Sequence, residues 1–217
     1  TYTWGSMPRP KRIQFKGAWY HIFNRGINRK TIFYSKYHYL FFIELIKEAI
    51  NKFNIEIHSY CLMKNHYHLL IHTPNGNIAK AMHYILFKFA STINKDTNAD
   101  GNVFKDRYRS ILVDSDEYLL VLSRYIHLNP VASNICKNAE DYEWSSINEY
   151  TRDIDKASFL KKDKVLSYFN NKKEYKEYID LGMDSAIKQF YSRKYIYPIL
   201  GSDNFKNRIK QYYSQSK

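Results

Sequence analysis

Hydrophobic and polar residues follow two periods along the first half of this chain, and together they predict alternating strands and helices. Short aromatic and β-branched runs are typical of strands, whereas long segments with apolar residues at helical spacing predict core-facing helices. In chain order these elements are a strand at 18–24, a helix at 37–53, strands at 55–63 and 66–72, a helix at 78–94 and a strand at 103–113.

This order, β-α-β-β-α-β, predicts an α+β fold with the ferredoxin-like arrangement. In that arrangement helices cover one face of an antiparallel sheet, and we expect the other face to stay open for a site. The two central strands are joined at Lys64-Asn65, which is typical of a tight hairpin.

A third helix is predicted at 116–129, with Asp114 or Ser115 as its N-cap. Pro130 is expected to end it, because the residue before proline is pushed out of helical geometry. Beyond Asp141 the pattern predicts helical pieces only, at roughly 144–150, 158–169, 173–192 and 204–214.

The predicted organisation is one main domain at residues 7–150 followed by a helical C-terminal extension at 151–217. Residues 1–6 precede Met7 and end in Gly5-Ser6, which is typical of an expression remnant. The chain has no apolar run near the roughly 18 residues of a membrane span, so a soluble protein is expected.

The charge of the chain indicates which class of partner it binds, and its cysteine content indicates the cellular compartment. Lys and Arg total 34 against 21 acidic residues, a formal net charge of +13 that favours a polyanionic partner such as nucleic acid. The plain alternative is a solubilising surface in a lysine-rich proteome. Two distant cysteines, Cys61 and Cys136, support neither a disulfide framework nor a thiolate zinc cluster, so a cytoplasmic setting is expected.

The most informative chemistry is at His66-Tyr67-His68. Side chains alternate faces along a strand, so the two imidazoles point the same way, about 6 to 7 Å apart, and can reach one metal ion. An isolated pair of this kind is more often two surface or hydrogen-bonded histidines. Other residues must therefore decide between the two interpretations.

The helix predicted at 116–129 offers such residues. Tyr125 and Asn129 are four positions apart and share one helical face, about 6 Å from one another. A tyrosine nucleophile and an amide ligand could then approach the histidine pair together, leaving coordination positions open for a phosphate oxygen. The alternatives are a packing tyrosine and a helix-ending asparagine.

Five segments, in order, give the chain a wider likeness. They are NRGINRKTIF at 24–33, NHYHLLI at 65–71, GNVFKDRYRSILV at 101–113, RYIHLNPV at 124–131 and DYEWSS at 141–146. With these segments the sequence resembles the HUH-type single-tyrosine transposases, and most closely the REP-associated tyrosine transposases and their relatives. One variation is Tyr67 in the middle of the HUH triplet, where smaller aliphatic residues are common.

The resemblance implies that His66 and His68 bind a divalent cation, with magnesium or manganese favoured, and that Tyr125 attacks a phosphate of single-stranded DNA. It implies Asn129 as the third ligand. The products would be a 5′-phosphotyrosine and a free 3′ hydroxyl, which can later attack the adduct and rejoin strands. Residues 7–150 would then be a HUH single-tyrosine transposase domain.

For the DNA, the resemblance suggests a hairpin with a single-stranded flank as the substrate of a monomer or homodimer. Phosphate contacts are expected from basic residues in or beside the matched segments. These candidates are Arg25, Arg29, Lys30, Arg107 and Arg109. Each could equally be a solvated charge or the partner of an acidic side chain.

Two other functions stay open at this point. A domesticated DNA-binding protein would keep the fold and the basic surface without turnover, but it would not need His66, His68 and Tyr125 together. A hydrolase that activates water on a histidine-bound metal would leave Tyr125 dispensable.

Overall fold

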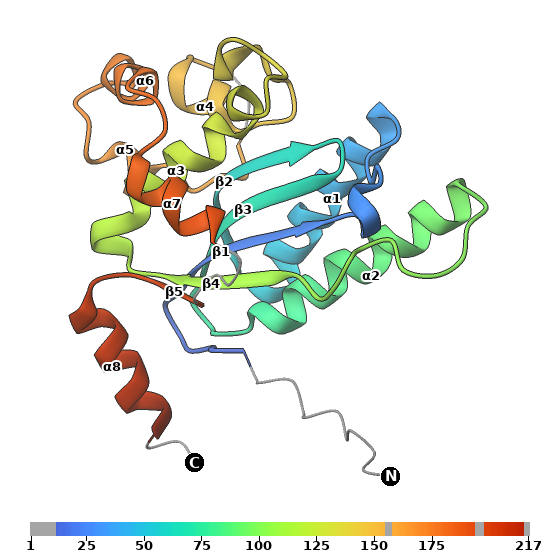
Figure 1. Ribbon diagram of the computed structural model, residues 1–217, viewed down its shortest axis with the longest axis horizontal. Helices are drawn as coiled ribbons and strands as arrows, with labels where there is room; N and C mark the ends of the chain where they lie inside the picture. The colour runs from blue at the N-terminus through green and yellow to red at the C-terminus, as the bar shows by residue number, and fades with distance from the viewer. Residues whose placement is uncertain (1–11, 155–157, 194–197, 215–217) are drawn as a thin grey trace.

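The computed structural model describes residues 12–154, 158–193 and 198–214 and shows an α+β fold built on one five-stranded sheet (Figure 1). The strand order is β2-β3-β1-β4-β5, and the first four are mutually antiparallel neighbours. The strands are β1 (Ala18–Arg25), β2 (Glu56–Met63), β3 (His66–Thr73), β4 (Arg109–Val113) and β5 (Ile199–Leu200). The α+β fold and the β-α-β-β-α-β order predicted from the sequence are therefore confirmed. The expression remnant expected at residues 1–6 lies outside the described residues.

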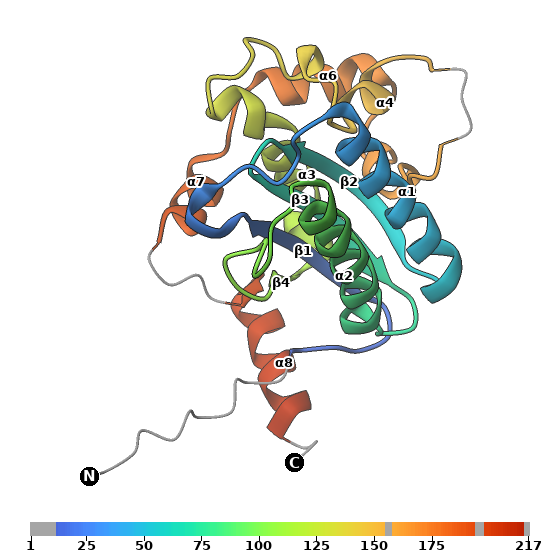
Figure 2. The ribbon, with the colours of Figure 1, turned by 90° about the vertical axis from the view of Figure 1, so that its right-hand side faces the viewer.

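Helices α1 (Lys36–Phe53) and α2 (Ile78–Asp96) cover one face of the sheet, in front of it in Figure 2. The alternation of strand side chains directs Tyr67, Leu69 and Ile71 of β3 to this face, where all three are fully buried. The core between the sheet and these two helices fixes the register of β3, because a shift by one residue would send its apolar side chains to the opposite face.

The sequence predicted that the opposite face would stay open, and this prediction was wrong. Helix α3 (Ser115–Ala132) packs across β2 and β3 on that face. A buried hydrogen bond of 2.8 Å joins Ser59 Oγ on β2 to Ser123 Oγ on α3. The same face therefore carries the odd-numbered side chains of β1, the even-numbered side chains of β3 and one side of α3. This arrangement leaves the end of the sheet near the β2–β3 turn for a site.

Pro130 does not end α3, so that prediction was wrong: the helix continues to Ala132. A proline lacks the N–H that would bond to the carbonyl four residues earlier, but only one such bond is lost here. The helix ends less than one turn later, where the Ser133 N–H bonds to the Asn129 carbonyl. Val131, in this last turn, packs against the main core and helps to hold the turn in place.

The fourth strand is shorter than predicted, because β4 begins only at Arg109. Residues 103–108 instead form a loop with one isolated bridge between Phe104 and Gly26. The sequence Lys105-Asp106-Arg107 breaks the apolar alternation here, and these three polar residues line a cavity described below.

Beyond residue 141 the described residues form helices and one short strand, and several of these helices contact α3. These helices are α4 (Ile147–Thr151), α5 (Asp163–Leu166), α6 (Lys172–Asp180), α7 (Ser185–Ser192) and α8 (Asp203–Ser214). Elsewhere in the described residues are two 3-10 turns, η1 (Ile27–Arg29) and η2 (Ala139–Asp141). The single helix expected at 173–192 is split into α6 and α7 around Gly182, which has a φ of +82°.

Two features of this region tie it to the sheet. Tyr175 of α6 is fully buried, and its hydroxyl lies 2.9 Å from both Ser123 Oγ and His127 Nδ1 of α3. Strand β5 pairs in parallel with β4, so the expectation of helices alone in the tail was incomplete. None of the helices within the described ranges is long and apolar enough to cross a membrane.

Candidate active site

A two-residue turn between β2 and β3 positions the two histidines at the start of β3. Both imidazoles lie on the α3 face of the sheet, with ring centroids 5.2 Å apart and planes nearly perpendicular. Tyr67 between them points to the other face, where its ring packs 5.1 Å from that of Phe42. The bulky middle residue therefore fills the core without disturbing the pair.

The Nδ1 atoms of both histidines are already engaged, which fits metal binding through the Nε2 atoms. His66 Nδ1 lies 2.6 Å from the side-chain oxygen of Asn65, which only accepts, so Nδ1 carries the proton and Nε2 keeps its lone pair. His68 Nδ1 lies 2.9 Å from Nε2 of His21 on β1. Such partners fix the ring orientation of a metal-ligating histidine.

His21 extends this hydrogen-bond chain to the C-terminal region. Its Nδ1 lies 2.6 Å from the hydroxyl of Tyr191 on α7. If His21 donates to Tyr191, its Nε2 accepts from His68 Nδ1–H, and His68 Nε2 is left as a free donor of electrons to a metal. If every hydrogen bond in this series ran the other way, His68 Nε2 would carry a proton and could not bind a metal. Metal binding would therefore select the arrangement in which His21 donates to Tyr191.

Burial keeps these imidazoles in the neutral form that metal ligation requires. It lowers the pKa of His66 to about 4, with a further contribution from Arg25, and the pKa of His21 to about 3. The pKa of His68 lies well below its usual range for the same reason, and its two neighbouring histidines lower it further. The donor set therefore fits a divalent cation at neutral pH.

Tyr125 of α3 lies beside this pair on the same chain. Its ring centroid is 5.8 Å from that of His68 and 5.9 Å from that of His21, both in edge-on contact. Tyr191 stacks on it at 4.5 Å, nearly parallel. Burial raises the pKa of Tyr125 to about 12, and hydrogen bonding with Asn129 offsets this only in part.

Asn129 follows one turn later, and its side-chain nitrogen donates 2.7 Å to the Tyr125 carbonyl. Because a carbonyl only accepts, the amide must present its nitrogen there, which leaves the side-chain oxygen as the available ligand atom. Asn129 is 8% exposed, so this orientation is held in a nearly dry environment. His127, by contrast, points into the core, 2.9 Å from the Tyr175 hydroxyl and 2.7 Å from Ser146 Oγ.

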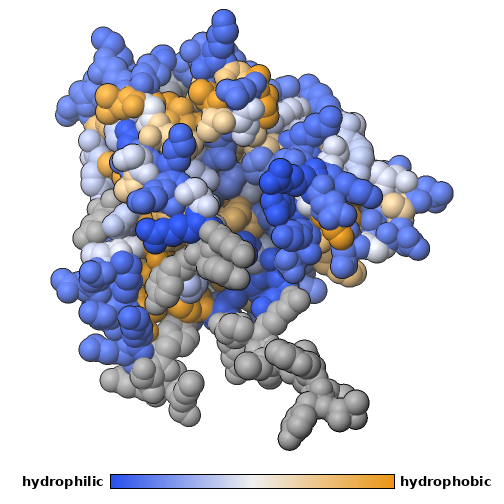
Figure 3. Space-filling view, in the orientation of Figure 1, coloured by the Kyte–Doolittle hydropathy of each residue, from blue (hydrophilic) through white to orange (hydrophobic). Residues whose placement is uncertain are grey.

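A cavity of about 910 Å³ opens beside His66. Its lining is strongly basic, with Asp106 as the one acidic residue among the described residues that line it. The basic residues are Arg25, Arg29, Lys64, Lys105, Arg107, Arg109 and Arg193. Four of the five predicted phosphate contacts are in this set, whereas Lys30 is not. Figure 3 shows this side of the molecule as largely hydrophilic, with a hollow near its centre.

The sequence matches the profile of the family described as "Transposase IS200 like" over residues 14–129, more than half of the chain. This chain belongs to the IS200-like transposase family. The matched span includes both histidines, Tyr125 and Asn129, and it ends at Asn129.

One solved structure supports the fold of this transposase. A REP-associated tyrosine transposase bound to a REP hairpin matches with a TM-score of 0.57 and 18% identity, covering 70% of this chain and 92% of that one. A Deinococcus radiodurans R1 protein assigned as a transposase matches with a TM-score of 0.39 and 16% identity, covering 55% and 95%. No curated protein sequence gives a significant match.

Two residues beside the candidate site, His21 and Tyr191, were not predicted from the sequence. His21 carries a signal, since it alternates with Trp19 and Phe23 on a predicted strand, but only the β1–β3 register brings it against His68. Tyr191 carries none, because it is one of 21 tyrosines and lies outside the matched segments.

Proposed function

We propose that this transposase is a metal-dependent endonuclease and strand transferase for single-stranded DNA, with Tyr125 as its nucleophile. The observation that carries the proposal is the approach of Tyr125 to His68 within one chain, at 5.8 Å between ring centroids. A nucleophile and a metal-ligand pair on one face are what transesterification of a phosphodiester needs.

His66 and His68 would hold the cation through Nε2, and Asn129 would supply an amide oxygen. Magnesium or manganese suits this site, because positions remain for phosphate and water oxygens. When bound, the cation would offset phosphate charge and stabilise the departing 3′ oxygen. A tyrosine whose pKa is raised to about 12 by burial needs such help before it can attack at neutral pH.

The protein's own residues account for the rest of the step. The Tyr125 oxygen forms a bond to phosphorus as the bond from phosphorus to the 3′ oxygen breaks. The phenol loses one proton and the 3′ oxygen gains one, so charge balances. Because the 5′-phosphotyrosine keeps a phosphodiester, a 3′ hydroxyl can attack it and release Tyr125 without a nucleotide cofactor.

The basic cavity beside His66 supports DNA as the ligand. Guanidinium groups at Arg25, Arg29, Arg107 and Arg109 can bind phosphates along a strand that leads to the histidine pair. The related REP-associated transposase is bound to a REP hairpin, which supports a hairpin with a single-stranded flank as the substrate here. Tyr125 lies against His68 of its own chain, which supports a reaction in which Tyr125 and the histidine pair of one chain act together.

The test is the formation of a denaturation-resistant protein–DNA adduct. The full-length protein is incubated with 5′-labelled and 3′-labelled hairpin DNA carrying single-stranded flanks, with magnesium or manganese. We expect the adduct only with the label 3′ of the cut, and its loss in Tyr125→Phe and in His66→Ala. Tyr118→Phe, on the same helix, is the matched control and should retain the adduct.

Three outcomes would contradict the proposal in different ways. An adduct that persists in Tyr125→Phe and disappears in Tyr191→Phe would move the nucleophile to the stacked neighbour. Cleavage without an adduct would indicate a metal-activated water. Tight DNA binding without cleavage on any hairpin substrate would indicate a protein that only binds DNA.

A further inference from the structure

A second group of metal-ligating side chains lies at the far end of the β2–β3 hairpin from the turn. Glu56 pairs with His72 across the two strands. The β2 register shifts between Ile57 and Ser59, so His58 is the extra residue of a bulge. Bulges re-aim side chains, and here His58 joins Glu56 and His72 in place of continuing the alternation.

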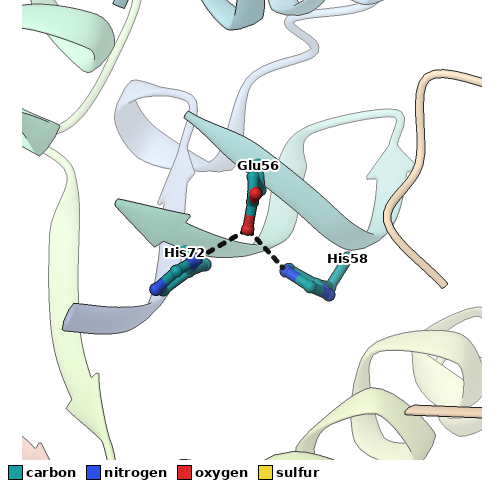
Figure 4. A group of neighbouring side chains, drawn as sticks. All are labelled: Glu56, His58 and His72. Carbon is teal, nitrogen blue, oxygen red and sulfur yellow. Dashed lines mark hydrogen bonds and ion pairs between the residues drawn. The ribbon is translucent and has the colours of Figure 1, made fainter. Parts of the chain in front are cut away.

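The three side chains converge on one carboxylate oxygen, as Figure 4 shows. Glu56 Oε2 lies 2.7 Å from His72 Nδ1 and 3.8 Å from His58 Nε2. One ligand atom from each residue lies within 4.8 Å of the others. Two ligands that each lie about 2.0–2.1 Å from a tetrahedral ion are about 3.4 Å apart, so small side-chain movements would complete such a site.

His58 is a buried group that lacks a satisfactory partner. It is 3% exposed, and neither ring nitrogen has hydrogen-bond geometry with any residue that the structure describes. Burial lowers the pKa of His58 to about 4, against opposing contributions from Glu56 and the backbone at Lys161. A buried neutral imidazole without a hydrogen bond is unfavourable, and a metal ion would satisfy it.

We propose that Glu56, His58 and His72 form a second metal site, of the zinc class, separate from the one at His66 and His68. Two imidazoles and one carboxylate are a donor set that zinc takes, whereas magnesium prefers oxygen ligands. The side chains of His72 and Glu56 are 20% and 32% exposed, which leaves room for a water in the fourth position.

The two sites are far enough apart to be occupied independently. His68 and His72 are four residues apart on β3, which separates them by about 13 Å. Trp19 of β1 marks the second site, since its ring lies 4.2 Å from that of His58 and 4.7 Å from that of His72. An ion there would join the ends of β2 and β3 and stabilise the folded chain.

The experiment measures zinc stoichiometry on the full chain after metal removal, by equilibrium dialysis, in a His66→Ala/His68→Ala background that lacks the first site. We expect one zinc per chain. Adding His58→Gln or His72→Gln should remove it, while His83→Ala, at an exposed histidine of α2, should leave it unchanged. DNA cleavage plays no part in this measurement, so failure here would leave the nuclease proposal untouched.

Thermal unfolding gives a second measurement of zinc binding, and it can be made on small amounts of each variant. Free zinc at about one hundred times its Kd should raise the melting temperature of the His66→Ala/His68→Ala protein by about 5–10 °C, and the shift should vanish with His72→Gln. Cobalt should give visible absorption bands of a tetrahedral site that disappear in the same variant. No zinc in the double-variant background, or zinc retained in both glutamine variants, would overturn the proposal.

Discussion

At the scale of single residues, a chain of hydrogen bonds runs from His68, one of the proposed metal ligands, through His21 to Tyr191. His21 is fully buried, and its two ring nitrogens bridge His68 Nδ1 at 2.9 Å and the Tyr191 hydroxyl at 2.6 Å. A neutral His21 can donate in only one of these directions. Binding of a metal through His68 Nε2 would therefore require that His21 donates to the Tyr191 hydroxyl and accepts from His68 Nδ1–H.

From this chain of hydrogen bonds we predict that His21→Gln weakens metal binding at the proposed site, although it removes none of the proposed ligands. Loss of a partner that orients a ligating histidine costs about 10- to 100-fold in metal affinity. We expect the magnesium or manganese concentration for half-maximal adduct formation to rise by that factor, with a smaller rise in Tyr191→Phe. His38→Gln, at a buried histidine that instead contacts Asp96, is the control. An unchanged metal dependence in His21→Gln would contradict the proposed role.

The site residues differ in how far the sequence could reveal them. His66 and His68 share a face because strands have a period of two, and Tyr125 and Asn129 share a face because helices have a period near four; both follow from local geometry. His21 depends on strand register, and Tyr191 on the packing of a helix more than 60 positions beyond Tyr125, so neither could be placed before the chain was folded.

At the scale of elements, α7 places Tyr191 against the site through a small cluster of its own. Ile187 of α7 packs with Ile111 of β4 and Leu200 of β5, separately from the main core. Tyr125 and Tyr191 pack against the same cluster. The position of α7 therefore decides whether Tyr125, the proposed nucleophile, keeps its stacking partner.

We expect Ile187→Ala to reduce adduct formation more than its effect on global stability would explain. The cavity should cost about 2–4 kcal/mol, concentrated in α7, so this helix should open locally and release Tyr191. Hydrogen exchange should show lost protection in residues 185–192. Ile179→Ala, a matched change in α6 at a residue also 3% exposed or less, should destabilise without the same loss of adduct.

Equal losses of adduct in the two isoleucine variants, at equal fractions of folded protein, would show that α7 has no particular link to the reaction. The comparison depends on urea unfolding of both variants, which gives the folded fraction at the assay temperature. Rescue of Ile187→Ala by low temperature would support local opening, because the helix would reseat.

The elements themselves were predictable where the pattern was long and periodic. Helices α1 and α2 and strands β1 to β3 match their predicted segments closely, since each has a clear apolar face buried in the main core. Strand β5 has two residues and no alternation, and it exists because β4 offers it a free edge. Proline's local preference failed at Pro130, where tertiary packing of α3 outweighs one lost hydrogen bond.

At the scale of the whole molecule, buried neutral histidines tie stability to pH. Burial lowers the pKa of His21 and His127 to about 3 and that of His58 and His66 to about 4, whereas an unfolded histidine titrates near 6.5. Between these values the unfolded chain binds protons that the folded chain does not. Stability must therefore fall as the pH is lowered from about 6.5 toward 4.

We expect the urea midpoint, measured in EDTA to exclude metal effects, to fall between pH 7 and pH 4.5. Each such histidine contributes a slope of up to about 1.4 kcal/mol per pH unit. His127→Gln should reduce the slope, since it removes one proton-binding group from the unfolded chain alone. A midpoint that stays constant or rises on acidification would show that these histidines are protonated in the folded protein.

The net charge of +13 is a property of the whole chain, but the cavity concentrates it beside the proposed metal site. Binding of single-stranded DNA should weaken with salt, with a slope in log K against log salt of about −0.7 for each phosphate neutralised. Replacing Arg25 and Arg107 with Gln should remove two such contacts and reduce the magnitude of the slope by about 1.4. Anisotropy titrations in EDTA, which prevents cleavage, would measure it.

The matched control for this prediction is Lys173→Gln on α6, where the side chain is 85% exposed and does not line the cavity. It lowers the net charge by one without touching the proposed DNA path. If general charge governed binding, one lysine on α6 would count as much as one cavity arginine. We expect instead that Lys173→Gln leaves the slope unchanged, because only charges that contact phosphates release counterions. Equal effects per charge at both places would make the cavity an ordinary part of a basic surface.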